Sequence, residues 1–130
     1  MFGHKQPTIK SLISPGCAIE GNVVFQDGLR LDGELRGNVL GRPGSASILV
    51  VSESATVHGE IEADHVIVNG AVHGPVRARV MLELQPKARV LGDVTYQALE
   101  MHQGALVNGR LCPMQDAAAS VVPAAPQVSD

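Results

Sequence analysis

The chain of 130 residues carries a formal net charge of −3, with acidic and basic residues mixed along its length, and only 2% of its residues are aromatic. Because nucleic-acid binding usually needs a basic face and rings that stack on bases, this composition argues against nucleic acid as a partner. The length fits a single domain. The abundance of valine, with so few rings to fill a core, predicts strands around a narrow aliphatic interior.

Residues 1–10, MFGHKQPTIK, are polar apart from Met1, Phe2 and Ile9, and we expect them to form a flexible tail. They lack the apolar stretch of a secretory signal. No apolar run in the chain reaches the ~20 residues that span a bilayer, and the two cysteines make no disulfide framework. These features together predict a cytoplasmic protein.

Residues 11–114 repeat one motif six times around a chosen set of glycines. An aliphatic residue stands two positions before and two positions after each glycine, and a small residue stands four before it. This alternation with period two predicts half-buried strands, and a glycine on the inward face suits a tight bend. The six glycines are Gly21, Gly37, Gly59, Gly74, Gly92 and Gly109.

Successive glycines are 15 to 22 residues apart, which is enough for a coil of three short strands and three corners. The pattern therefore predicts an all-β fold, a single parallel β-helix of about six rungs stacked at ~4.8 Å. Left-handed hexapeptide helices would place the intervals on multiples of six. Because the intervals vary and parallel crossovers are right-handed, we predict a right-handed coil.

Two further features belong to the repeat. The longest interval contains LGRPGSASILV, which we expect to form a loop ejected from one corner. An apolar residue also stands eight positions before each glycine and is expected to form another inward column, which comprises Ile13, Leu29, Val51, Val66, Leu84 and Met101.

The tripeptide Val-His-Gly occurs twice and places His58 and His73 at the same position of neighbouring repeats. Since this position faces outward, the two imidazoles are expected to lie one above the other, and their recurrence follows from the repeat. The alternative is a zinc site with His65 as the third ligand. A catalytic zinc needs three converging ligands, however, and the position of His65 in the repeat predicts a different face.

The sequence indicates no catalytic residues, cofactor or metal site. Its aspartates form no acid–base pair, and GRPGSAS lacks the Lys-Ser/Thr of a phosphate loop, so Ser45 and Ser47 are interpreted as loop residues. Cys17, expected to be small buried filler, and Cys112 would be ~24 Å apart after five rung steps. That separation is too large for a disulfide within one chain.

Residues 115–130, QDAAASVVPAAPQVSD, are rich in Ala, Pro and Ser without periodicity and are expected to form a disordered tail. Neither tail has the periodicity of a capping helix, so both ends of the rod should expose strand edges and a slice of core. Such ends are expected to stack into a homopolymer without nucleotide. The polymerisation interface inferred in this way comprises Ile13, Ile19 and Val23 at one end and Leu106, Leu111 and Met114 at the other.

The repeats resemble the bactofilins, a family of bacterial cytoskeletal proteins. The resemblance covers residues 8–114 and rests on runs such as IEGNV, LDGELRGNV, VHGEIEADHVIVNGAVHGPV and VLGDV. It implies a right-handed triangular β-helix that polymerises without nucleotide on the inner face of the cell membrane. The resulting filaments would be scaffolds for cell-wall or morphogenesis proteins.

The resemblance also extends to the first residues of the chain. Members of the family often begin with Met-Phe and nearby basic residues as a membrane-targeting peptide, and here Met1, Phe2 and Lys5 stand in those places. His4 departs from this pattern, because a firmer positive charge would favour the membrane.

Two other functions remain open from the sequence. A non-polymerising β-helix adaptor would present one face to a partner protein and would sediment as a small defined species. A trimeric β-helix acyltransferase or metal hydratase would need a cleft between subunits, and a stoichiometric zinc would indicate it.

Overall fold

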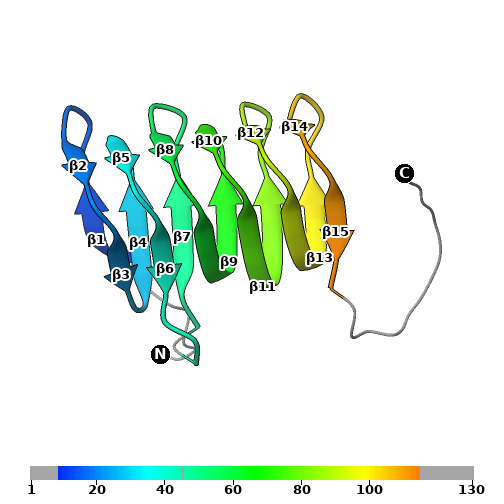
Figure 1. Ribbon diagram of the computed structural model, residues 1–130, viewed down its shortest axis with the longest axis horizontal. Coiled ribbons are helices and arrows are strands. Elements are labelled where there is room, and N and C mark those ends of the chain that lie inside the picture. The colour runs from blue at the N-terminus through cyan, green and yellow to red at the C-terminus, as the bar shows by residue number, and fades with distance from the viewer. Residues whose placement is uncertain (1–8, 45, 115–130) are drawn as a thin grey trace, which may run out of the picture.

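The computed structural model describes residues 9–44 and 46–114, which form fifteen β-strands coiled into six stacked rungs (Figure 1). Every strand pairing among these residues is parallel. The same residues contain no helix long and apolar enough to cross a membrane. Strand β1 begins at Ile9, two residues inside the segment that we assigned to the N-terminal tail.

The strands form three faces. The first face contains β1 (Ile9–Ile13), β4 (Gly28–Leu31), β7 (Ile48–Val51) and the second halves of β9 (Ile61–Val68), β11 (Val76–Leu84) and β13 (Val94–Met101). The second contains β2 (Ala18–Glu20), β5 (Glu34–Arg36), β8 (Thr56–His58), β10 (Ala71–His73), β12 (Arg89–Leu91) and β14 (Leu106–Asn108). The third contains β3 (Val23–Phe25), β6 (Val39–Gly41), the first halves of β9, β11 and β13, and β15 (Leu111–Pro113).

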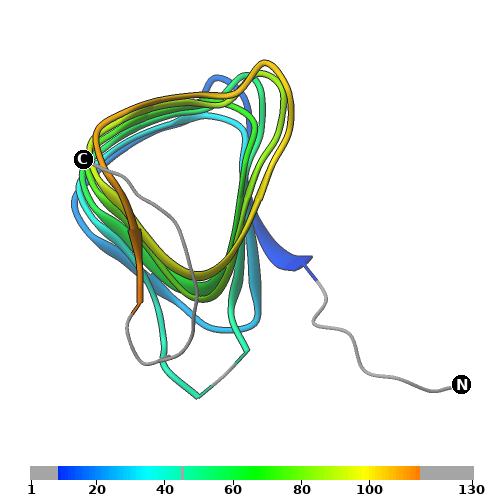
Figure 2. The ribbon, with the colours of Figure 1, turned by 90° about the vertical axis from the view of Figure 1, so that its right-hand side faces the viewer.

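The coil is right-handed, as predicted. Figure 2 looks along the rod from its C-terminal end, and the chain turns counterclockwise as it advances toward the viewer. The cross-section is triangular in the same view, with one face on each side. This hand agrees with the general preference of parallel crossover connections.

Inward-facing side chains of successive rungs stack into columns. The columns two residues before and two residues after the glycines are confirmed, since Leu35 pairs with Val57 and Val39 pairs with Ile61. From the second rung to the fifth, no side chain in either column is more than 2% exposed. Each such side chain contributes about 1.5–3 kcal/mol by burial, so aliphatic columns stabilise a core in which Phe25 is the one buried aromatic ring of the described residues.

The prediction of an inward column eight residues before each glycine was wrong in two copies, the second and the fourth. Leu29 and Val66 are buried, but they belong to a different column of the first face. In these two rungs the corner between the first and second faces is shorter, and a Cβ at Gly33 or Gly70 would overlap a backbone oxygen of the preceding rung. The column that the pairing forms comprises Ile13, Leu31, Val51, Val68, Leu84 and Met101.

The predicted glycines occupy the corner between the second and third faces, where stacked backbones approach closely. The N–H of Gly37 donates to the carbonyl oxygen of His58 at 3.0 Å. A Cβ at Gly59 would overlap the carbonyl oxygen of Gly37, and Gly59 has a positive φ of 155°. Beside it, Oδ1 of Asn38 accepts the N–H of Glu60 at 3.0 Å, so a side chain also links the rungs here.

The segment between β6 and β7 projects from the corner between the third and first faces, as predicted (Figure 2). Ser47 is not the ordinary loop residue that we expected, because it is fully buried and its Oγ accepts the N–H of Asp64 at 3.0 Å. Arg79 closes the same corner by donating to the Gly41 carbonyl at 2.7 Å and to Asp64 at 2.9 Å. Ser45 lies outside the described residues.

We expect Gly59→Ala to lower the free energy of unfolding by about 1–3 kcal/mol through backbone strain alone, and by more because the new Cβ meets the Gly37 carbonyl. Gly21→Ala is a matched control, because Gly21 occupies the same corner with φ of 131° and has nothing within 4 Å of its Cβ position. Urea unfolding of both variants, in a background that does not assemble, measures the difference. Equal losses would contradict the close approach of the rungs.

Candidate polymerisation interface

The coil ends on unpaired strand edges at both sides of the described residues. Strands β1, β2 and β3 pair only with the second rung. At the other end, β14, β15 and the second half of β13 pair only with the fifth rung. Each end therefore presents a row of backbone N–H and C=O groups without a strand partner in the described chain, which is a template for further pairing.

The aliphatic core is open at the C-terminal end. Leu111 is 46% exposed, whereas Val94, the residue below it in the same column, is fully buried. Met101 is 42% exposed above the fully buried Leu84. Their exposure follows from the absence of a seventh rung in the described chain, so the sixth rung offers an apolar surface that another rung would cover.

The N-terminal end is more closed. Ile13 is 8% exposed, and Ile19 and Val23 are half-buried against the core. Phe25, one of the few rings in the chain, is also 8% exposed and pairs with Gly41 of the second rung. The ring of Phe25 therefore lies next to a position of the second rung that has no side chain.

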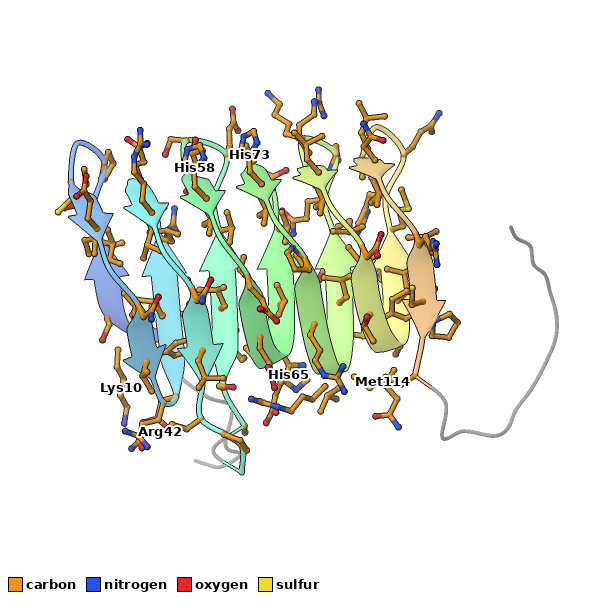
Figure 3. The ribbon with its side chains drawn as sticks, viewed as in Figure 1. Lys10, Arg42, His58, His65, His73 and Met114 are labelled. Carbon is orange, nitrogen blue, oxygen red and sulfur yellow. The ribbon has the colours of Figure 1, made fainter. Side chains whose placement is uncertain are left out.

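The C-terminal residues that we placed in the interface differ in orientation. Leu111 belongs to an inward column, and Met114 is half-buried at the end of the rod, where its N–H donates to the Tyr96 carbonyl at 2.7 Å (Figure 3). Leu106 is in the terminal rung but pairs with Arg89 in an outward column of the second face. Sequence reasoning left out Met101, although its place in the last copy of an inward column was the available signal.

The histidines are arranged as the repeat predicts. His58 pairs with His73 on neighbouring strands, and their rings stack with centroids 4.8 Å apart (Figure 3). Nε2 of His58 lies 3.5 Å from a carboxylate oxygen of Glu34. His65 lies on the first face, paired with Ile48, and so does not converge with the stacked pair.

Three other residues near the ends carry reactive or titratable groups. Cys17 is exposed rather than buried filler, because it lies in the first rung. Cys112 belongs to the sixth rung, and both cysteines are free thiols. Burial raises the pKa of Tyr96, and the neighbouring Cys112 raises it further, so the phenol adds no charge to this end at neutral pH.

The residues expected to reach a membrane, Met1, Phe2 and Lys5, lie outside the described part of the chain, as does the C-terminal tail 115–130. The structure therefore leaves the membrane prediction as it stood.

Comparison with known proteins agrees with this architecture. The family model of the bactofilins, described as polymer-forming cytoskeletal, matches residues 11–112. That match runs from the first rung to the last. The chain belongs to the bactofilin family. Bactofilins are a cytoskeletal family and not a family of enzymes.

Two bactofilins of Myxococcus xanthus (strain DK1622) are similar to the chain. Bactofilin BacP is 27% identical over 101 residues, which cover 78% of this chain and 40% of BacP. Bactofilin BacO is 29% identical over 98 residues, which cover 69% of this chain and 78% of BacO. The chain thus spans less than half the length of BacP. No solved structure matches the chain.

Leu111→Arg is expected to give a folded protein that no longer assembles, because a guanidinium would be buried without a partner when another rung covers it. Val80→Arg is the matched control, since Val80 is 43% exposed but lies on β11, outside both terminal rungs. Sedimentation and circular dichroism of both variants provide the readout. Filaments formed by Leu111→Arg would show that this end does not carry the contact.

Proposed function

We propose that this bactofilin polymerises end to end into filaments without a nucleotide, at the cytoplasmic face of the cell membrane. There it acts as a scaffold for cell-wall or morphogenesis proteins. The observation that carries the proposal is the open core of the sixth rung, where Leu111 and Met101 are exposed although the columns beneath them are buried.

The contact between ends needs no cofactor. A rung added to an open edge gains backbone hydrogen bonds of the kind that already join the rungs, such as the 2.9 Å bond from the N–H of Val94 to the Arg110 carbonyl. It also buries apolar side chains at about 25 cal/mol per Å² of surface removed from water. Because each added subunit exposes a new open end, such a contact does not close, and growth gives a filament.

The membrane part of the proposal rests on the first residues of the chain, Met1, Phe2 and Lys5. One Phe side chain contributes only about 1.5–3 kcal/mol when buried, which is too little to hold a single subunit on a bilayer. Repetition of the same segment along a filament converts weak single contacts into strong overall binding. Membrane binding should therefore depend on assembly.

Electron microscopy of negatively stained protein, purified without nucleotide or metal, tests the filament. We expect filaments or sheets, together with rapid sedimentation, because both ends of the described rod carry unpaired edges. A uniform monomer, dimer or trimer would contradict this proposal and would favour the non-polymerising adaptor.

Phe2→Ser is expected to abolish flotation of filaments with anionic lipid vesicles in a density gradient while leaving the filaments intact. Leu111→Arg, with the N-terminal segment unchanged, should lose most vesicle binding as well, because it lacks multivalency. Undiminished binding of Phe2→Ser would show that another part of the chain contacts the lipid. Strong binding by an unassembled Leu111→Arg protein would show that the attachment does not need the filament.

A further inference from the structure

A cluster of three side chains near the C-terminal end lies outside the proposed interface and the stacked histidines. Glu83 on the fifth rung and Glu100 on the sixth are directly paired in the parallel ladder of the first face. His102 follows β13 at the next corner. One ligand atom from each of the three side chains lies within 4.8 Å of the other two.

The two carboxylates are like charges that face each other on adjacent strands, an arrangement that is destabilising unless a positive charge lies between them. Among residues 9–44 and 46–114, neither Glu83 nor Glu100 forms an ion pair with a lysine or arginine. Their only ion-pair partner is His102, whose imidazole is neutral when it acts as a metal ligand. The pair therefore lacks a permanent counter-charge in this part of the chain.

The imidazole of His102 faces both carboxylates at ion-pair distance, and its side chain is 40% exposed. Nε2 of His102 lies 3.1 Å from Oε2 of Glu100 and 3.3 Å from Oε2 of Glu83. The same nitrogen is shielded from solvent and has no hydrogen-bond partner in the described structure. A shielded nitrogen that makes no hydrogen bond is costly, and here it lies between two carboxylate oxygens.

The two separations from Nε2 of His102 match those of atoms that share one metal ion, and the two carboxylate oxygens lie within 4.8 Å of each other. Ligands bound to Zn²⁺ at about 2.0–2.1 Å in a tetrahedron are about 3.3 Å apart. Gln85 also donates from Nε2 to Oε2 of Glu83 at 3.1 Å, so an outer hydrogen bond orients that carboxylate, as is usual around metal ligands.

In the second rung, the positions equivalent to this cluster carry side chains of opposite charge, which need no ion to balance them. Arg30 occupies the column of Glu83 and Glu100, and Asp32 occupies the column of His102. A hydrogen bond from the Ser52 hydroxyl, followed by the nearby Arg30 guanidinium, lowers the pKa of Asp32 despite partial burial. The charges are balanced within the chain there, whereas at Glu83 and Glu100 they are not.

We propose that Glu83, Glu100 and His102 bind one divalent transition-metal ion of the zinc class, which bridges the fifth and sixth rungs. A set of one imidazole and two carboxylates favours such an ion over the all-oxygen sites that suit Ca²⁺ or Mg²⁺. Because the ligands come from two rungs, the ion holds the terminal rung in place. The inference does not rest on filament formation.

Equilibrium dialysis of full-length, tag-free protein against Zn²⁺ after treatment with EDTA, followed by metal analysis, tests the site. We expect one zinc per chain, with affinity reduced at least ~10-fold in both His102→Gln and Glu100→Gln, and weaker binding of Mg²⁺. His58→Gln is the matched control, because His58 is another surface histidine beside a glutamate. No saturable zinc, zinc binding unchanged in His102→Gln, or zinc binding lost in His58→Gln would overturn the proposal.

Thermal unfolding separates a metal site from a simple ion pair. Zinc should raise the Tm of the wild-type protein and leave that of His102→Gln unchanged. In EDTA at pH 8, Glu100→Gln should be at least as stable as the wild-type protein, because it removes the repulsion with Glu83. A Glu100→Gln protein that is less stable under those conditions would show that His102 alone satisfies the glutamates, and the metal site would be wrong.

Discussion

The structure depends on the parallel stacking of one rung on the next. Backbone N–H groups of the strands donate to carbonyls of a neighbouring rung, so residues at equivalent positions must lie in register along the whole rod. At the glycine corner this constraint is severe, because Gly37, Gly59 and Gly74 approach so closely that a Cβ would enter the backbone beneath it. Length differences between repeats are consequently placed in the other two corners, where the chain can bulge or project without disturbing the ladder.

Stacking also determines where the rod is weak. An inner rung has two neighbours and an end rung has only one, so stability in such a fold is a sum of rung and interface contributions. The fully buried Leu84 and the 42% exposed Met101 occupy the same column and differ mainly in having a rung above them. The surface that would drive assembly is therefore the ordinary core of the coil, cut at its end, and not a separate binding site.

Because the assembly surface is part of the repeating core, the sequence predicts those features of the fold and of the site that depend on the repeat. Strict periodicity marked the glycine corner, the aliphatic columns and the stack of His58 on His73, because each depends only on position in the repeat. Deviations from the period were missed, such as the shortened corners at Gly33 and Gly70 and the buried hydroxyl of Ser47. Whether a loop residue such as Ser47 is buried depends on the local path of the chain, and the composition of the loop does not determine that path.

The glutamate and histidine cluster was missed for a related reason. Glu83 and Glu100 share one column of the repeat, but His102 approaches them from the following corner, and its proximity depends on how tightly that corner turns. The repeated tripeptide pointed instead to His58 and His73, which stack on each other away from this cluster. An ion bound by residues of two rungs would strengthen the contact between those rungs. This contact determines the stability of an end rung, which has only one neighbour. Ion binding would therefore affect assembly by stabilising the sixth rung, because this rung determines the shape of the open end.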